Sequence, residues 1–319
     1  MRSRRRVHAR LVLLGALAVL ASTPVAPAGA QTAGDVFRIV EVTEGAHAAL
    51  VRGDAPLYAF ANSLVVFGTR GVLVVDTQQS PVAARTLLDW IRRRTRLPIR
   101  WVVNTHAHSD HTYGNQVYRE AFPDVGIVAH ETVRRFVLET APRRLADEIR
   151  DLESSIADRR RWLATGMRDD GTPLTDAARA AFERSLTIRS AYLPELRTLR
   201  LTPPDVVFRD RLALDLGGRI VELIAMGPAH TAGDVVVHLP GEGIMAVGDL
   251  LEEGSLWTAC ADLSGWARAL ERIAGYRPRV VLPAHGGIQR GDSLLRDQRA
   301  FLRAPPADTT AAPDCRLAP

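Results

Sequence analysis

Residues 99–111 read IRWVVNTHAHSDH and join an apolar run to a dense group of polar side chains. The run 99–104 is short, apolar and partly β-branched, which favours a buried β-strand. Imidazole and carboxylate groups follow within six residues, and both suit zinc as ligands. The stretch therefore predicts a metal site at the carboxyl end of a buried strand. Its candidate ligands are His106, His108, Asp110 and His111.

The spacing within this group allows for two metal positions. In an extended turn alternate side chains share a face, so His106 and His108 point the same way. Asp110 continues that alternation, whereas His111 points elsewhere. One turn can therefore present ligands to two metal ions that lie close together.

Three further ligand-type residues lie far along the chain, each beside glycine near the predicted end of a strand. They are His230 in GPAHTAGD, Asp249 after strand 244–247, and His285 after strand 279–282. Glycine permits a close approach of the backbone at such points. Each residue has a plausible structural role by itself, but together they predict the remaining ligands.

The other segments predict two strand-rich parts, each ending in alternating strands and helices. This pattern favours two packed sheets with helices outside them. The remaining predicted strands are 36–42, 63–67, 72–75, 126–129, 206–208, 219–225 and 234–239. The predicted helices are 81–94, 112–122, one from residue 131, 264–274 and 292–302.

Residues 140–200 form a charged insert between the two strand-rich parts. Apolar residues recur there at spacings of three, four and seven, which is typical of amphipathic helices. Glycines within 166–171 break the pattern, and Thr172 followed by Pro173 predicts the start of a second helix. We expect this helical hairpin to be either a lid over the site or an arm that forms a homodimer.

The first thirty residues have the organisation of a secretory signal peptide. An arginine-rich start precedes an apolar run of about ten residues and an Ala28-Gly29-Ala30 cleavage site. The run is too short to span a membrane, so we expect a periplasmic or secreted protein without a stable membrane anchor. Export also permits a disulfide between Cys260 and Cys315, although the sequence leaves their pairing open.

The charge balance argues for a small-molecule substrate and against nucleic acid as a partner. The net charge is +5, but without the five arginines of the signal segment the 41 basic residues fall to 36, equal to the 36 acidic residues. A neutral exported chain does not attract polyanions. The sequence contains no lysine, which excludes a Schiff-base lysine or a lysine general base.

The metal-ligand motifs, in this order along the chain, resemble those of the metallo-β-lactamase-fold hydrolase superfamily. The resemblance covers roughly residues 36–304 apart from the helical insert. It implies an α/β fold, a four-layer αβ/βα sandwich, with one domain over 31–304 and a flexible tail over 305–319. The matching positions are Asp76 at the end of an early strand, His106-x-His108-x-Asp110-His111, His230, Asp249 and His285.

The resemblance also implies how the ligands are shared between two zinc ions, with iron or manganese as alternatives. One zinc would be held by His106, His108 and His230, and the other by Asp110, His111 and His285. Asp249 would bridge the two ions, and Asp76 would support the ligands without binding metal.

The expected function is an exported zinc-dependent hydrolase, in which a metal-bridging hydroxide attacks the carbonyl of a small ester, lactone, thioester or amide. Asp110 would orient this nucleophile and pass its proton to the leaving group. A β-lactamase is the nearest alternative. Many members of the largest β-lactamase subclass, however, have cysteine where this chain has Asp249, and a nearby lysine that this chain lacks. An iron-dependent redox enzyme and a non-catalytic binding protein remain further alternatives.

Several other residues could reach the site, but structural roles explain them equally well. His47 could overhang the site and His130 could support a ligand, whereas the alternation around His238 predicts that it points outward. The remaining candidates for substrate contact are Tyr113, Asn115, Trp257 and Trp266.

Overall fold

The computed structural model describes residues 32–254, 256–259 and 261–304. The predicted signal segment 1–30, the tail 305–319 and both cysteines, Cys260 and Cys315, lie outside these residues. Among the helices of the described ranges, none is long and apolar enough to cross a membrane.

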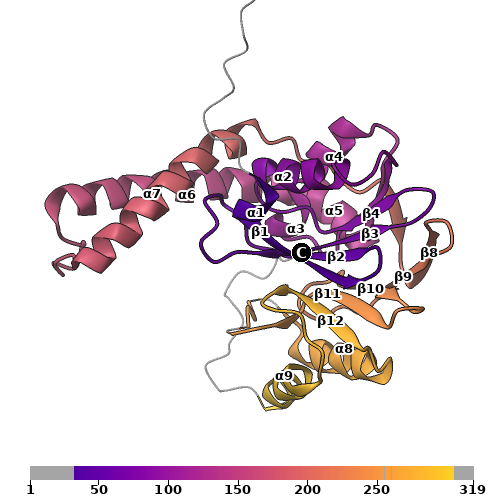
Figure 1. Cartoon of the computed structure of the whole chain (residues 1–319). Helices are drawn as coiled ribbons and strands as arrows, with labels where there is room; N and C mark the ends of the chain where they lie inside the picture. Colours follow the sequence, from indigo (N-terminus) through magenta and orange to yellow (C-terminus); the bar gives the residue numbers. More distant parts are fainter. Residues whose placement is uncertain (1–31, 255, 260, 305–319) are drawn as a thin grey trace, which may run out of the picture. The chain divides into compact units, whose positions relative to one another are not determined.

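The first sheet has seven strands in the order in which they occur in the sequence, and Figure 1 labels β1 to β4 among them. Its first four strands pair antiparallel, and pairing is parallel from β4 to β7. The carboxyl ends of the parallel strands therefore meet at one edge, where the polar stretch after β5 begins. The strands are β1 (Phe37–Thr43), β2 (Ala46–Val51), β3 (Ser63–Phe67), β4 (Val72–Val75), β5 (Ile99–Val103), β6 (Gly126–His130) and β7 (Val206–Phe208).

The second sheet has five strands in the order β12-β11-β10-β9-β8. Only β11 and β12 pair parallel, and their register shifts on either side of Gly248. Because pairing resumes at Glu252, β11 runs past Asp249, and the prediction that this strand ends at residue 247 is wrong. The strands are β8 (Arg211–Asp215), β9 (Ile220–Ala225), β10 (Val235–Leu239), β11 (Ile244–Glu252) and β12 (Val280–His285).

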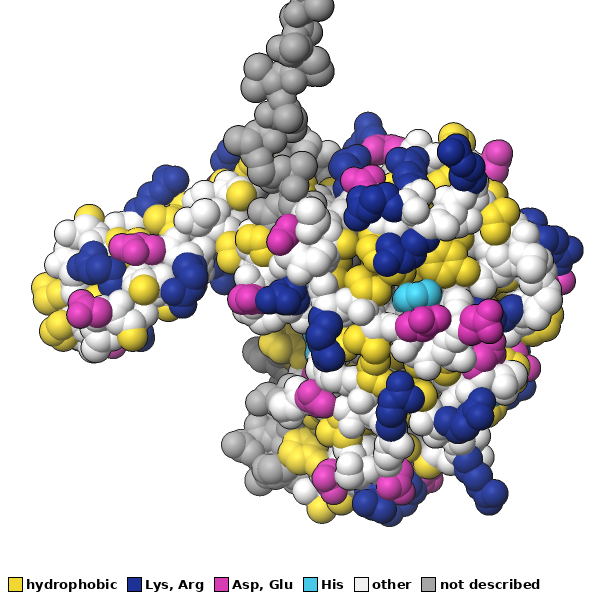
Figure 2. Space-filling model, in the orientation of Figure 1, with side chains coloured by type: hydrophobic (Ala, Val, Ile, Leu, Met, Phe, Trp, Pro, Cys, Tyr) yellow, Lys and Arg dark blue, Asp and Glu magenta, His cyan; other side chains and the backbone are white. Residues whose placement is uncertain are grey.

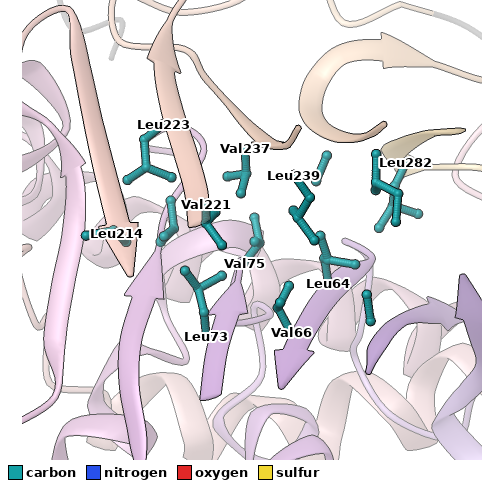
Figure 3. Packing of buried hydrophobic residues seen from close by; sticks show 14 of the residues in the cluster. Leu64, Val66, Leu73, Val75, Leu214, Val221, Leu223, Val237, Leu239 and Leu282 are labelled. Atoms are coloured by element: carbon teal, nitrogen blue, oxygen red, sulfur yellow. The ribbon is translucent and has the colours of Figure 1, made fainter. Parts of the chain in front are cut away.

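The main core lies between the two sheets and confirms the predicted sandwich. Figure 3 shows leucine and valine side chains from both sheets pointing toward one another. These residues alternate along each strand, as expected for a strand with one face toward this core. They include Leu64, Val66, Leu73 and Val75 of the first sheet and Val221, Leu223, Val237, Leu239 and Leu282 of the second.

Helices cover the outer face of each sheet and complete four layers. On the first sheet they are α1 (Ala33–Val36), α2 (Pro81–Arg92) and α4 (Asn115–Ala121). On the second they are α8 (Leu263–Gly275) and α9 (Ser293–Arg303). The predicted single helix 112–122 is wrong, because a short helix α3 (Ser109–Thr112) begins inside the polar stretch and ends before α4.

The insert is a helical hairpin, as predicted. It follows α5 (Glu131–Glu139) and consists of α6 (Ala141–Thr165) and α7 (Asp176–Thr198), which pack against each other (Figure 1). Arginine and acidic side chains lie between hydrophobic ones on its surface (Figure 2). The predicted start of the second helix is wrong: the hydroxyl of Thr175 caps α7, and Pro173 pairs with Met167 within the connecting turn.

Two glutamates of the hairpin contact the segment that follows β4. Glu148 of α6 accepts a hydrogen bond from Nε2 of Gln79 at 2.6 Å, and Glu195 of α7 accepts one from Oγ of Ser80 at 2.6 Å. The hairpin is therefore held to the first sheet by contacts between residues distant in the sequence.

Candidate metal centre

All seven predicted ligands converge, six from the carboxyl-end regions of β5, β11 and β12 and His230 from the connection between β9 and β10. They form two groups, and within each group the ligand atoms lie within 4.8 Å of one another. The first group is His106, His108, His230 and Asp249, and the second is Asp110, His111 and His285.

The stretch after β5 changes conformation in the middle, which differs from the predicted extended turn. His108 is extended, with φ of −64° and ψ of 157°, and it precedes the first residue of α3. Asp110 and His111 therefore lie on a helical turn, which turns them toward the second group.

In the first group, three imidazole nitrogens and one carboxylate oxygen face a common point. Nδ1 of His108 lies 3.0 Å from Nε2 of His106 and 3.1 Å from Nε2 of His230. Oδ2 of Asp249 lies 3.5 Å from each of these two Nε2 atoms.

In the second group, the same carboxylate supplies its other oxygen. Oδ1 of Asp249 lies 3.3 Å from Nε2 of His111 and 3.4 Å from Nε2 of His285. Oδ2 of Asp110 lies 3.5 Å and 3.3 Å from the same two nitrogens. Asp249 therefore lies between the groups, with one oxygen directed to each.

These residues fit metal ions in both groups. A tetrahedral zinc with Zn–N distances near 2.0–2.1 Å separates its ligand atoms by about 3.3 Å, close to the separations found here. Nε2 of His111 and Oδ1 of Asp249 are buried without a hydrogen-bond partner, and a metal ion could coordinate both atoms. The set of histidine and carboxylate ligands suits zinc, iron or manganese.

The protonation states in the first group also suit metal binding. Burial, followed by the charge of His106, lowers the pKa of His108 well below its usual value. Burial lowers the pKa of His230 to about 3. Both imidazoles are therefore neutral near pH 7 and offer lone pairs to a metal.

The second group carries an excess of negative charge. Burial by itself would raise the pKa of Asp249 and Asp110, but the neighbouring histidines hold both well below the usual value. Burial by itself would lower the pKa of His285, but hydrogen bonds to these carboxylates raise it to about 10. The group thus binds positive charge strongly, as protons or as a metal cation.

Asp76 and Thr105 orient two of the histidines. The carboxylate of Asp76 accepts hydrogen bonds from N of Thr105 at 2.8 Å and from its Oγ1 at 2.9 Å, and it lies 2.9 Å from Nδ1 of His111. Oγ1 of Thr105 in turn lies 3.2 Å from Nδ1 of His106. A proton on Nδ1 of each ring leaves Nε2 free to face the metal position.

Glycine at residue 248 lets β11 approach this support. Gly248 has a φ of 57°, and a Cβ atom there would lie 2.6 Å from Oγ1 of Thr105. Any larger residue would push Asp249 away from the histidines.

Residues that support the backbone of His111 were missed by the sequence reasoning. Nδ2 of Asn104 and Oγ1 of Thr77 donate to the carbonyl oxygen of His111 at 2.7 Å and 3.0 Å. Asn104 also exchanges hydrogen bonds with the side chain of Asn115. Asn104 and Thr105 lie within residues 99–111, and their place directly before His106 is the only feature of the sequence that could have indicated this role.

Three other histidines of the described ranges lie outside the ligand groups. His47 packs against Phe67 and Trp90 in the layer outside the first sheet, and His130 caps α5. His238 alternates with Val237 and Leu239, which face the core between the sheets, so it points outward as predicted. It is buried, because Nδ1 lies 3.1 Å from Oε2 of Glu222 and the ring contacts Tyr276.

The two tryptophans near Asp249 differ from each other. Trp266 is buried, its ring lies 5.1 Å from that of His230, and its Nε1 donates to the carbonyl oxygen of Leu250 at 2.8 Å. Trp257 is 63% exposed. Trp266 is therefore a core residue, as predicted, and its ring packs against the candidate ligand His230.

A cavity of about 910 Å³ lies between His285, one of the candidate ligands, and the helical hairpin. His285 and Gly286 lie at its metal-centre end, and Ile188 and Arg189 of α7 lie on another wall. The loop 52–60 completes the wall between them. A small molecule bound here can reach the second ligand group.

Comparison with known proteins agrees with this fold. A sequence model of the metallo-beta-lactamase superfamily matches residues 59–285. A linear primary-alkylsulfatase of Pseudomonas sp. is 24% identical over 240 residues, 72% of this chain and 43% of that protein. A metallo-beta-lactamase type 2 of Bacteroides fragilis is 29% identical over 92 residues, 27% of this chain and 37% of that protein. The chain spans about half the length of the curated relatives it matches, or less.

Solved structures show the same fold. A metallo-beta-lactamase from Pontibacter korlensis superposes with a TM-score of 0.57 and 21% identity, over 84% of this chain and 99% of that chain. A metallo-beta-lactamase from Pseudomonas aeruginosa, in a mono-zinc form, gives a TM-score of 0.54 and 20% identity, over 84% and 95% of the two chains. At such identities the likeness shows the fold alone.

Proposed function

Because the chain belongs to the metallo-beta-lactamase superfamily, we propose that it is a hydrolase that uses two zinc ions. The position of Asp249 carries this proposal, since each of its oxygens faces a separate group of ligands. A carboxylate in this position can bridge two metals.

In this proposal each ligand group holds one ion. His106, His108 and His230 hold the first, while Asp110, His111 and His285 hold the second. Bound zinc would lower the pKa of water to about 7 and polarise a carbonyl group of the substrate.

Asp110 is the proposed proton carrier. The carboxylate of Asp110 is more exposed than that of Asp249. It can therefore contact a bound substrate while it also contacts His285. It would orient the attacking water, accept its proton and transfer that proton to the leaving group. Asp76 and Thr105 would hold the histidines in the tautomers that this chemistry requires.

The proposed substrate is a small ester, lactone, thioester or amide. A sulfate ester is a second candidate, because the alignment with the alkylsulfatase covers 72% of this chain. A β-lactam is less favoured, since the alignment with the Bacteroides fragilis metallo-beta-lactamase covers only 27% of this chain. The sequence also has no lysine to pair with a substrate carboxylate. An iron-dependent redox reaction is the alternative for the same ligand set.

We also propose that the mature protein is periplasmic or secreted and acts on a small molecule, without nucleic acid. The signal-like segment and the neutral charge of the remaining chain support this proposal. The hairpin α6–α7 is proposed to control access to the cavity or to form a homodimer.

Metal analysis combined with a substrate screen tests the function. The chain from Gln31 onward would be purified without added metal and analysed by mass spectrometry for zinc, iron and manganese. Hydrolysis would then be followed with nitrocefin, lactones, aryl esters, thioesters, an aryl sulfate and bis-p-nitrophenyl phosphate. We expect two equivalents of zinc and turnover of an ester-type substrate. Bound iron together with oxygen consumption would overturn the proposal.

A further inference from the structure

The helical insert places one arginine, Arg189, on the wall of the cavity beside His285. We propose that Arg189 of α7, with Arg159 of α6 behind it, binds the acidic group of an organic anion. The scissile bond of that anion would lie toward His285 at the other end of the cavity. This inference deepens the proposed function and rests on it for the reaction at the metal centre.

The two guanidinium groups converge on a single hydroxyl. Nε of Arg159 and Nε of Arg189 each donate a hydrogen bond to Oγ of Ser185 at 3.1 Å. A serine oxygen has two lone pairs, so both are used here. Arg159 is half-buried, and burial together with the charge of Arg189 lowers its pKa. Two like charges are thus held close together, which an anion would offset.

Neither guanidinium is neutralised by an acidic residue. Over the described ranges, no carboxylate lies within 4.0 Å of Arg159 or Arg189. Arg52 also lines the cavity, but its guanidinium is paired with Asp54 at 2.9 Å. Arg189 therefore presents to the cavity a cation that contacts Ser185 and Tyr58 and whose charge no described carboxylate neutralises.

The acidic group of Glu253 does not compete for this arginine. Its carboxylate accepts hydrogen bonds from N of Gly287 at 3.0 Å and from Nε2 of Gln289 at 2.6 Å. It is thereby directed to the β12 side of the cavity, away from α7.

Aromatic rings beside Arg189 give the cavity an apolar surface. The ring of Tyr58 stacks on Tyr192 with centroids 4.2 Å apart, and Phe60 contacts Tyr58 edge-on at 4.8 Å. The guanidinium of Arg189 lies 5.6 Å from the centre of the Tyr58 ring. Phe60 is 48% exposed, which leaves apolar area for a ligand. A carboxylate, sulfonate or sulfate attached to an apolar group matches this combination of charge and rings.

Binding of two matched probes tests the anion site without requiring turnover. Calorimetry on the zinc-loaded protein would compare 2-phenylethanesulfonate with neutral 2-phenylethanol. We expect Arg189→Gln to weaken sulfonate binding about tenfold and to leave alcohol binding unchanged, because only the charge-assisted hydrogen bond is lost. Arg159→Gln should give a smaller loss in the same direction.

Arg184→Gln is the matched control, since Arg184 lies on the same helix and is exposed. It should bind both probes as the wild type does. Sulfonate binding by Arg189→Gln within twofold of the wild type, with circular dichroism showing an intact fold, would overturn the inference. An equal loss in Arg184→Gln would also overturn it.

Kinetics separate this inference from the proposed function. The ratio of kcat/KM for mono-p-nitrophenyl glutarate to that for p-nitrophenyl acetate should fall about tenfold in Arg189→Gln. Equal ratios in the two proteins would contradict the anion site alone. Absence of turnover of every substrate in the screen by the wild type, with sulfonate discrimination retained, would contradict the proposed function and support the anion site.

Discussion

Replacing Asp76 by asparagine tests how far metal binding depends on a carboxylate that lies behind the ligands. Oδ1 of Asp76 accepts from the backbone N–H of Thr105, while Oδ2 lies 2.9 Å from both Oγ1 of Thr105 and Nδ1 of His111. An asparagine side chain has one acceptor oxygen and one NH2 group. The NH2 group would therefore face groups that now donate to a carboxylate oxygen of Asp76. At least one of the three contacts is therefore lost, or His111 moves its proton to Nε2.

The magnitude follows from these contacts. Loss of a hydrogen-bond partner behind a metal-ligating histidine typically costs 10–100-fold in metal affinity, or about 1.4–2.7 kcal/mol. Asp76→Ala would instead leave three buried groups unpaired at about 1–3 kcal/mol each, on the order of 3 kcal/mol or more of folding free energy. The asparagine variant is therefore the cleaner probe of metal binding.

Competition with a chromogenic chelator measures the effect. We expect Asp76→Asn to release one of two zinc equivalents 10–100-fold more readily than the wild type, with a smaller change in the other. Asp89→Asn, an exposed change on α2, is the control and should leave both equivalents unchanged. Wild-type affinity for both equivalents in Asp76→Asn would refute the role assigned to this carboxylate.

Three further outcomes follow from the site and the hairpin. Asp110→Ala should lower kcat by about 100-fold or more with little loss of fold, and wild-type turnover at full metal occupancy would contradict the mechanism. Burial raises the pKa of Glu148, so its favourable contribution to stability is present below its unfolded pKa and is lost as pH rises through the folded pKa. The free energy of unfolding in urea would be measured for Glu148→Gln and the wild type at pH 4 and pH 8. The variant should be more stable relative to the wild type at pH 8 than at pH 4, and an equal difference between the two proteins at both pH values would contradict this prediction. Deletion of the hairpin should change kinetics or size in solution, whereas no change in either would refute both of its proposed roles.

The sandwich and the converging ligands were predictable because their signals are local. A buried strand followed by HxHxDH is recognisable from the residues themselves, and His230, Asp249 and His285 each lie near a strand end beside glycine. The strands β3, β4 and β7 occupy the predicted residues, since short runs rich in β-branched residues have few alternatives.

The missed elements lack such signals or depend on distant contacts. Half of the residues of β2 are alanine, and β8 begins with Arg211 and ends with Asp215, so neither has strong strand propensity. Packing against Glu222 and Tyr276 buries His238 despite its alternating position. The pair Arg159 and Arg189 comes from two helices, and no spacing in the sequence shows that both reach Ser185.

The two glutamate contacts of the hairpin have a consequence for the support behind His111. The segment that they hold contains Asp76 and Gln78 at positive φ, 58° and 76°, conformations that cost on the order of 1–3 kcal/mol each. The contact between Ser80 and Glu195 joins residues 115 positions apart, and contacts of such separation form slowly. The docked hairpin thus restrains the strained segment that carries Asp76, so removing the hairpin should loosen the support behind His111 although all seven ligands remain in the chain.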